Sequence, residues 1–298
     1  MSVLAFDPLA RTNAEILIAL AIDEDLGPDR RDLTAEAAIP KNGRGSARFV
    51  ARKPGVVSGL PVLEMVAATF GLRSWFRNLT RDGAKIEPGE AIAEVFGPYR
   101  EMLMMERTAL NFVQRLSGIA TLTARFVEQV AETQGVILDT RKTTPGWRAL
   151  EKYAVRCGGG TNHRFGLYDA VLIKDNHLAW LAALPDPIAT AVRAARGAVA
   201  EGVIVEIEVD TLEQLDQALR AGPDIILVDN FGAEALREAV RRRDEAAPGI
   251  LIEASGGIHL GNVGELARAG VDRLSVGALT HSAPALDIGL DFDHAIPS

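Results

Sequence analysis

The chain has 298 residues, 48% of them hydrophobic, and a formal net charge of −8. That length is ample for a sizeable core in one or two domains, and the acidic balance argues against a broad nucleic-acid surface. A single cysteine, Cys157, excludes an internal disulfide and is typical of a reducing compartment. The sequence shows neither a signal-peptide pattern nor an uncharged apolar run near the ~20 residues that span a bilayer. We therefore expect a cytoplasmic protein without a membrane partner.

The first third of the chain mixes helical and strand patterns. Asp7-Pro8 is typical of a helix start, and apolar residues then recur at helical spacing up to Gly27. Residues 23–40 are polar and irregular. From Gly45 onward the pattern predicts short strands separated by turn residues, with one helix over 62–70. This part therefore predicts a mixed α+β unit.

A long helical pattern follows Pro98. It runs from about Arg100 to Leu116, breaks near Gly118 and continues as a second helix to about Gln134. In the first of these helices Arg107, Asn111 and Gln114 share one face. Two interpretations stay open: a solvated stripe on a half-buried helix, or an Arg107 that reaches a ligand, even across a subunit interface.

From residue 137 the chain repeats one theme, in which a β-branched apolar run ends in a polar residue and a helix follows. The predicted strands are 137–140, 170–174, 204–209, 225–228, 251–253 and 273–276, and the predicted helices include 187–199, 211–221, 233–245 and 262–269. Such alternation predicts a parallel sheet. A seventh strand near Tyr153–Cys157 would leave an incomplete or irregular (β/α) barrel. The fold class is therefore α/β.

The stretch 137–176 concentrates positive charge, with seven Lys/Arg against four Asp/Glu. In a (β/α) barrel the active site lies at the carboxyl ends of the strands. Arginine and lysine at these ends suit a small anion such as a dicarboxylate or a pyrophosphate. Five cationic candidates are found here: Arg141, Lys142, His163, Arg164 and Lys174. For any one of them, ordinary ion pairing with Asp139, Asp169 or Asp175 is an equal alternative, and His163 alone is more often structural.

Acidic side chains and glycine turns follow on the later strands. Glu206 and Glu208 point to the same side of their strand, and Asp229 ends the next strand. These oxygens suit Mg²⁺ together with a substrate phosphate, or else pair with Lys174 or Arg141. Two glycine turns, 255–257 and 276–278, offer backbone N–H groups for a phosphate. Cys157 is interpreted as a packed thiol.

At these residues the sequence resembles the quinolinate phosphoribosyltransferase (carboxylating nicotinate-nucleotide pyrophosphorylase) family over nearly its whole length. The segments that most resemble it are ERTALNFVQRLSGIATLT (106–123), DTRKTTPGWR (139–148), GGGTNHRFGLYDAVLIKDNH (158–177), EIEVD (206–210), LVDNF (227–231), EASGGI (253–258) and SVGALTHS (275–282). The resemblance implies transfer of a phosphoribosyl group from phosphoribosyl diphosphate to quinolinate, with Mg²⁺, giving nicotinate mononucleotide, diphosphate and CO₂.

The resemblance also implies a role for each site residue. Arg107, Arg141, His163 and Arg164 would bind the two quinolinate carboxylates, and Glu208 and Asp229 the ribose hydroxyls and Mg²⁺. The 5′-phosphate would lie on Ser255, Gly256, Gly257, Gly277 and Ala278, and Thr140, Val276 and His281 complete the substrate-binding set. The expected catalytic residues are Lys142, Lys174, Glu208 and Asp229, with both lysines between the pyridine ring and the diphosphate.

The resemblance further implies a fold and an assembly. An N-terminal α+β open-sandwich domain, 1–116, would be joined by the tail 285–298, and 117–284 would form the incomplete barrel. A homodimer would share its active sites, with Arg107 supplied by the neighbouring subunit and the N-terminal unit covering the partner's barrel mouth. No nucleic acid is expected as a partner.

Three other functions stay open at this point. The first is a Schiff-base lyase that uses Lys174 or Lys142. The second is a related phosphoribosyltransferase that acts on another pyridine acid without decarboxylation. The third is a non-catalytic metabolite sensor, for which the acidic residues would be dispensable.

Overall fold

The structure is a computed structural model that describes residues 5–293. Contacts divide the chain into two compact units. The first comprises Met1–Ala124, Thr143–Gly159 and Leu279–Ser298, and the second comprises Arg125–Lys142 and Gly160–Ala278. The chain therefore leaves the second unit after Lys142 and re-enters it at Gly160.

The first unit begins with helix α1 (Pro8–Leu26), as the sequence predicts. The Asp7 side chain accepts a hydrogen bond from the Ala10 N–H at 2.9 Å, and Pro8 occupies the first turn, where an N–H has no helical partner. The helix ends at Gly27, whose φ of 65° lies in the left-handed region. Ala10, Ala14, Ile18 and Ile22 form its buried stripe.

A small antiparallel sheet and short helices complete this unit. Its further elements are α2 (Leu33–Ala38), β1 (Arg44–Ala51), β2 (Gly55–Val56), α3 (Leu60–Thr69), η1 (Arg73–Trp75), β3 (Phe76–Asn78), β4 (Lys85–Ile86), β5 (Ala91–Pro98) and β12 (Ile288–Phe292). The larger sheet has the order β12-β1-β5-β3, and β2 pairs with β4. The chain end thus returns to pair with β1, Leu290 lying opposite Phe49. These elements confirm the predicted α+β character of the N-terminal part.

Helix α2 corrects the prediction that 23–40 is irregular. The Asp32 side chain accepts hydrogen bonds from the N–H groups of Thr34 and Ala35, each at 2.9 Å, and so provides an N-cap. The helix has only six residues. It is too short for a periodic apolar pattern to appear in the sequence.

The predicted break near Gly118 is also wrong, because α4 (Tyr99–Val130) is one continuous helix of 32 residues. Gly118 serves a packing role instead. A Cβ built on it would meet the carbonyl oxygen of Pro284 and would lie 3.0 Å from the Cα of Ala285. The glycine therefore allows a second backbone segment to pack directly against the helix.

Helix α5 (Arg148–Cys157) replaces the seventh strand that was predicted near Tyr153–Cys157. Leu150, Tyr153, Ala154 and Cys157 are buried, and their i, i+3, i+4, i+7 spacing is helical. The apolar run that suggested a strand is the buried face of this helix. Glu151 is fully buried on the same helix and forms an ion pair with Arg115 at 2.7 Å.

The second unit is built on a parallel sheet. Its strands are β6 (Val136–Leu138), β7 (Val171–Ile173), β8 (Val205–Val209), β9 (Ile225–Asp229), β10 (Leu251–Ser255) and β11 (Arg273–Ser275), in the order β6-β11-β10-β9-β8-β7. All five pairings are parallel. The prediction of an α/β protein with an N-terminal α+β unit and an incomplete parallel barrel is therefore confirmed as a fold class, with six strands in this sheet rather than eight.

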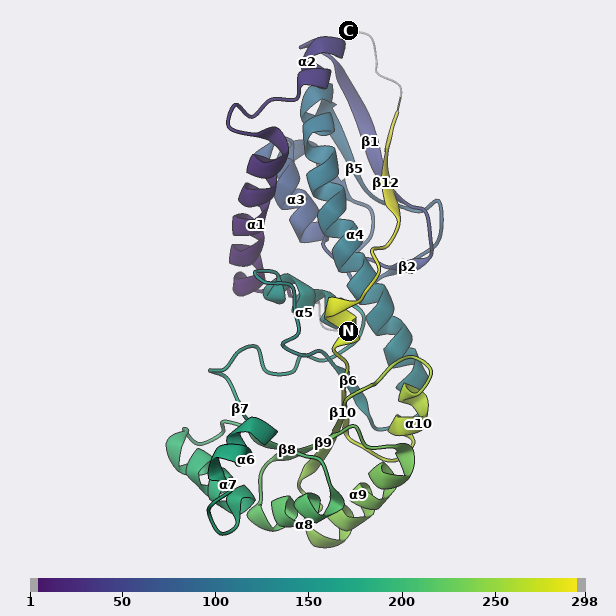
Figure 1. The fold of residues 1–298 in the computed structure, drawn as a ribbon. Coiled ribbons are helices and arrows are strands. Elements are labelled where there is room, and N and C mark those ends of the chain that lie inside the picture. The colour runs from purple at the N-terminus through teal and green to yellow at the C-terminus, as the bar shows by residue number, and fades with distance from the viewer. Residues whose placement is uncertain (1–4, 294–298) are drawn as a thin grey trace. The chain divides into compact units, whose positions relative to one another are not determined.

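Helices follow the strands of this sheet. They are α6 (Asp175–Leu181), α7 (Pro187–Ala198), α8 (Leu212–Ala221), α9 (Ala233–Ala246), α10 (Val263–Ala267) and α11 (Ala278–His281). In Figure 1, α7, α8 and α9 lie one after another along the outer side of the strands. The sequence determines where α8 begins and ends. The Thr211 side chain caps its start by accepting a 3.2 Å hydrogen bond from the Gln214 N–H, and Gly222 ends it with a φ of 72°.

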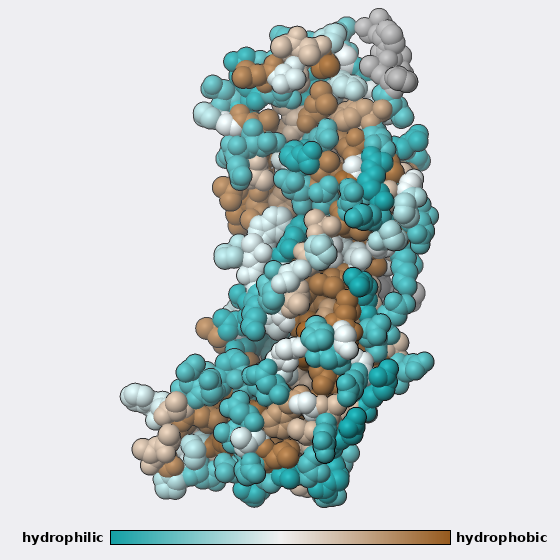
Figure 2. Space-filling view, turned by 45° about the vertical axis from the view of Figure 1, so that its right-hand side comes forward, coloured by the Kyte–Doolittle hydropathy of each residue, from teal (hydrophilic) through white to brown (hydrophobic). Residues whose placement is uncertain are grey.

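The face of the molecule that Figure 2 shows is mainly hydrophilic with scattered apolar patches. Among the exposed apolar side chains are Ile16 and Leu20 on α1, and Tyr168 and Trp180 in the second unit. Within residues 5–293 no helix is both long and apolar enough to cross a membrane.

The close packing at Gly118 predicts an unusual response to alanine. Alanine normally favours a helix over glycine by about 1 kcal/mol. At Gly118 we expect Gly118→Ala to lower the free energy of unfolding by about 1–3 kcal/mol, because its Cβ would overlap the Pro284 backbone. Urea unfolding followed by tryptophan fluorescence measures the change.

The matched control is Gly197 near the end of α7, where a built Cβ meets no other described atom within 4 Å. Gly197→Ala should raise the free energy of unfolding by about 0.5 kcal/mol. Equal stabilisation by both substitutions would contradict the packing role of Gly118.

Candidate active site

A cavity of about 410 Å³ opens at the carboxyl ends of the parallel strands. It is lined by Thr140, Arg141, Lys142, His163, Arg164, Leu172, Lys174, Glu208, Leu227, Asp229, Glu253, Ser255 and Ser275. All of these residues belong to the second unit. The location is the one that parallel α/β sheets favour for their sites, because the loops that follow the strands converge there.

The buried carboxylate of Asp139 holds one wall of the cavity in place. Asp139 follows β6 and is fully buried. Its Oδ1 accepts the main-chain N–H of His163 at 2.9 Å, and its Oδ2 accepts the side-chain amide of Asn162 at 2.6 Å. Thr161 forms a bridge with Leu138. These contacts fasten residues 161–164 beside the end of β6, where Arg141 and Lys142 follow.

The two arginines of this wall lie close enough to repel each other. Burial, and next the positive charge of Arg141, lower the pKa of the Arg164 guanidinium. The Arg164 Nη1 also donates to the carbonyl oxygen of Ala170 at 3.1 Å. Two fixed guanidinium groups in one cavity cost electrostatic energy that a bound anion would recover. The wall is therefore suited to a carboxylate or phosphate ligand.

Carboxylates form a second part of the lining, which we call the acidic wall. Glu208 on β8 has only 11% of its side chain exposed and forms an ion pair with Lys174. Asp229 ends β9, where its Oδ2 accepts the Asn230 side-chain amide at 2.6 Å. The pairing of Glu208 with Lys174 is one of the alternatives that the sequence left open. It also places a cation and two carboxylates within one cavity.

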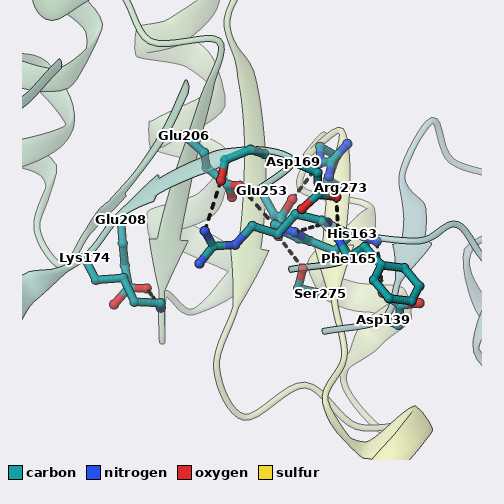
Figure 3. A network of polar contacts seen from close by, with 12 residues as sticks. Asp139, His163, Phe165, Asp169, Lys174, Glu206, Glu208, Glu253, Arg273 and Ser275 are labelled. Carbon is teal, nitrogen blue, oxygen red and sulfur yellow. Dashed lines mark hydrogen bonds and ion pairs between the residues drawn. The ribbon is translucent and has the colours of Figure 1, made fainter. Parts of the chain in front are cut away.

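His163 lies between two buried carboxylates, as Figure 3 shows. Its Nε2 is 3.2 Å from an oxygen of Glu206 and 3.2 Å from an oxygen of Glu253, and both glutamates are at most 1% exposed. We call these three residues the His163 cluster. Glu253 also accepts hydrogen bonds from Arg273 Nε, at 2.6 Å, and from the Ser275 hydroxyl. Glu206 Oε1 is buried with no hydrogen-bond partner among the described residues.

The His163 cluster retains one additional proton at neutral pH. Burial lowers the pKa of His163, but the hydrogen bonds and charges of Glu206 and Glu253 outweigh burial and raise it to about 9. Burial raises the pKa of Glu206, whereas contacts with His163 and Arg273 outweigh burial and lower the pKa of Glu253. This proton belongs to the cluster as a whole, because its three side chains titrate together. In the neutral ring His163 Nδ1 accepts the Arg164 N–H at 2.7 Å, which leaves the ring hydrogen on Nε2.

The glycine turn after β10 is shaped by its neighbour β9. Gly256 has a φ of 85°, and a Cβ on it would lie 2.8 Å from the main-chain nitrogen of Asn230. The Asn230 N–H donates to the Ser255 carbonyl oxygen at 2.9 Å. Only glycine permits this approach without strain. At Gly257, with a φ of 58°, a Cβ would meet no described atom within 4 Å, so open space lies beside it.

The structure brings many of the predicted site residues into one cavity. Those that line it are Thr140, Arg141, Lys142, His163, Arg164, Lys174, Glu208, Asp229 and Ser255. Gly256, Gly257, Val276, Gly277 and Ala278 belong to the same unit but not to the lining. Arg107, exposed on α4, and His281 belong to the first unit. The binding role of each remains a prediction.

Four lining residues were absent from the predicted set: Leu172, Leu227, Glu253 and Ser275. Glu253 was recognised only as a strand end. Leu172 and Leu227 lie inside apolar runs, and Ser275 lies inside β11, so their types alone indicate a core. The signal that could have revealed them is register, because side chains two residues apart on a strand face the same side.

An open parallel sheet whose strand ends bring arginines, lysines and carboxylates into one cavity defines an α/β enzyme of small-molecule substrates. The family models for the N-terminal and C-terminal domains of quinolinate phosphoribosyl transferase match residues 32–117 and 119–291. The chain therefore belongs to the quinolinate phosphoribosyl transferase family, as its sequence motifs predicted.

Relatives with assigned names agree along nearly the whole chain. The chain is 47% identical to the carboxylating nicotinate-nucleotide pyrophosphorylase of Mycobacterium leprae, covering 92% of this chain and 95% of that protein. Identity to the human protein of the same name is 37%, with coverage of 92% and 91%. The solved nicotinate-nucleotide pyrophosphorylase of Francisella tularensis has a TM-score of 0.87 at 35% identity, covering 98% of this chain and 100% of that one.

The shared proton of the His163 cluster predicts a pH dependence of stability. The unfolded chain releases the histidine proton near its ordinary pKa of 6.5, whereas the folded cluster keeps it up to about pH 9. The contribution to stability is therefore complete below about pH 6.5 and is lost as the pH rises to about 9. The loss should be about 3 kcal/mol.

Urea unfolding between pH 6 and pH 9.5 tests this expectation. The difference in unfolding free energy between the wild type and a His163→Gln variant should shrink as the pH rises. A difference that stays constant across this range would show that the cluster does not retain the proton.

Proposed function

We propose that the protein catalyses phosphoribosyl transfer from phosphoribosyl diphosphate to quinolinate with loss of CO₂, giving nicotinate mononucleotide and diphosphate for NAD biosynthesis. The observation that supports this most is a single cavity lined by Arg141, Arg164, Glu208 and Asp229, in a chain of this family. The relatives are named carboxylating nicotinate-nucleotide pyrophosphorylases.

The cationic wall is suited to quinolinate, a planar pyridine with two adjacent carboxylates. Arg141 and Arg164 would each pair with a carboxylate, and the repulsion between them would be relieved on binding. Leu172 and Leu227 are the apolar lining residues and would contact the faces of the ring. His163 would hold the backbone of Arg164 in place by accepting its N–H. Arg107 would come from a second subunit, which its exposure on α4 permits.

The acidic wall and the glycine turns are suited to the ribose and its phosphates. Glu208 and Asp229 would bind ribose hydroxyls, and their carboxylate oxygens fit Mg²⁺. Bound Mg²⁺ would neutralise charge on the leaving diphosphate. The 5′-phosphate would bind to the N–H groups of 255–257 and 277–278, where open space beside Gly257 leaves room for it.

The chemistry then proceeds in two stages. The C1–O bond of the ribose breaks, diphosphate leaves with the electron pair, and Glu208 and Asp229 stabilise the positive charge that develops on the ring. Lys142 and Lys174 bind the diphosphate oxygens. The pyridine nitrogen uses its lone pair to form the new C1–N bond. Its positive charge then stabilises the carbanion that remains when the 2-carboxylate leaves as CO₂, and a proton replaces the carboxylate.

A Schiff-base lyase is the alternative enzyme class, and the Lys174 contact argues against it. A Schiff base requires a neutral amine, whereas the Lys174 ammonium forms an ion pair with Glu208.

We also propose that the enzyme is a cytoplasmic homodimer with shared sites.

Product stoichiometry tests the proposed reaction. With phosphoribosyl diphosphate, Mg²⁺ and quinolinate labelled in its 2-carboxylate, we expect equal amounts of CO₂ and nicotinate mononucleotide, and neither product when a chelator removes the metal. Nucleotide from another pyridine acid without CO₂ would favour the related transferase. Trapping of a carbonyl substrate by borohydride would favour the lyase, and ligand binding without any product would favour a sensor.

The role of Arg141 predicts a selective defect. Losing a charge-assisted hydrogen bond of roughly 1.5–3 kcal/mol should raise the KM for quinolinate about 10- to 100-fold in Arg141→Ala. The KM for phosphoribosyl diphosphate should change by less than about threefold, because the ribose binds the acidic wall. Arg220→Ala, an exposed arginine on α8 outside the cavity, is the control and should leave both constants unchanged. An unchanged quinolinate KM in Arg141→Ala would refute this assignment.

A further inference from the structure

Glu253 is the most heavily bonded carboxylate beside the cavity. It is fully buried on β10, in contact with the neighbouring strand β11 and with the 161–164 segment. Its Oε2 accepts from Arg273 Nε at 2.6 Å, and its Oε1 accepts from the Ser275 hydroxyl and faces His163 Nε2 at 3.2 Å. Three donors thus converge on one carboxylate, as Figure 3 shows.

The other ring nitrogen of His163 determines which tautomer is present. Nδ1 accepts the main-chain N–H of Arg164 at 2.7 Å, so the ring hydrogen lies on Nε2 and is directed toward the carboxylates. At the same time the main-chain N–H of His163 donates to Asp139 at 2.9 Å. The ring and the backbone of His163 are therefore held from two sides, and the next residue, Arg164, lines the cavity.

We propose that Glu253 is a positioning residue of the substrate site. By accepting the Nε2–H of His163, Glu253 fixes the tautomer in which Nδ1 can accept the Arg164 N–H. That Nδ1 contact in turn fixes the backbone that directs the Arg164 side chain toward the substrate carboxylate. The role in quinolinate binding rests on the function proposed above. The role in fixing the tautomer does not depend on it.

A metal site is the competing interpretation of the same three side chains. One atom each from His163, Glu206 and Glu253 lie within 4.8 Å of one another. A metal-bound histidine donates its second N–H to an acceptor, whereas here the second nitrogen accepts an N–H. Both oxygens of Glu253 already accept hydrogen bonds from Arg273 or Ser275. The contacts therefore describe a hydrogen-bond network.

Glu206 provides a matched control for Glu253. It is also buried, and one of its oxygens lies at the same 3.2 Å from His163 Nε2. Its other oxygen has no hydrogen-bond partner among the described residues. In Glu206→Gln the amide oxygen can accept from Nε2, while the NH₂ group takes the unbonded position. In Glu253→Gln the NH₂ group must face a donor in either orientation, so a hydrogen bond is replaced by a repulsive contact.

The direct test is nitrogen-15 NMR of histidine side chains without substrate at about pH 10, above the His163 pKa of about 9, where the ring is neutral. In the wild type and in Glu206→Gln, His163 should show a protonated Nε2 and an unprotonated Nδ1. In Glu253→Gln the two tautomers should be mixed, or the Nδ1–H form should dominate. A wild-type His163 with its hydrogen on Nδ1, or a Glu253→Gln spectrum identical to the wild type, would overturn the proposal. This measurement needs no turnover, so an absence of transferase activity would refute only the function proposed above.

Kinetics test the consequence for the substrate. Glu253→Gln should raise the quinolinate KM at least tenfold and change the KM for phosphoribosyl diphosphate by less than about threefold, whereas Glu206→Gln should change either by less than about threefold. An altered KM with the wild-type tautomer would mean that Glu253 contacts substrate directly, which also overturns the positioning role.

A second variant decides the matter if Glu253→Gln does not fold. Arg273 donates to Glu253 and does not line the substrate cavity. Arg273→Lys keeps the positive charge but loses the fixed Nε donor, so it should loosen Glu253 and raise the quinolinate KM about threefold, with a mixed tautomer at His163. A folded Arg273→Lys protein with wild-type KM and tautomer would overturn the proposal.

Discussion

The candidate site depends on the buried carboxylate of Asp139. It binds the backbone of His163, 24 positions away in the sequence, and the side chain of Asn162. Through these two bonds a segment that lies far along the chain is fastened to the end of β6. These hydrogen bonds hold Arg164 beside Arg141 against the repulsion between their positive charges. A bound anion would relieve the same repulsion, so the contacts that hold the two arginines together also prepare the proposed anion site.

The charges of the site are distributed according to the order of the strands in the sheet. Arg141 and Lys142 follow β6 and Lys174 follows β7, and these are the two edge strands. Glu208 and Asp229 end β8 and β9, which lie between those edges. The ion pair between Lys174 and Glu208 joins the ends of the neighbouring strands β7 and β8. A substrate with an anionic leaving group and hydroxyl groups can replace that pair by one favourable partner for each side chain.

Much of the fold was predictable because its strands are β-branched runs that end in polar residues. β8 and β9 lie within one residue of their predicted bounds. Helix α5 was mistaken for a strand because its buried face, which includes Tyr153 and Cys157, reads as an apolar run. Gly118 was mistaken for a helix break because its reason, the backbone at Pro284, lies 166 positions further along the chain.

The site was predictable to a similar degree, and the limit has the same origin. A charged residue at a strand end can be predicted as a site residue from its position, as Arg141, Lys174 and Asp229 were. Leu172 and Leu227 could not be predicted in this way, because an apolar residue in a strand indicates a core whether or not a cavity lies beside it. The partners of His163 are also invisible in the sequence, since Glu206 and Glu253 lie on different strands and only the fold brings them to the same nitrogen.

Backbone strain at the ends of β9 and β10 points to the same part of the sheet. Asn230 has a φ of 58°, and Gly256 and Gly257 have φ values of 85° and 58°. Asn230 and Gly256 directly follow the cavity residues Asp229 and Ser255, which lie opposite each other in register. Left-handed conformations are unfavourable for a side chain such as that of Asn230, and they persist where the surroundings fix them. Here the Asn230–Ser255 bond and the close approach to Gly256 fix both turns together. Asp229 and the glycine turn after β10 are therefore fixed together, and a shift of either would move the other.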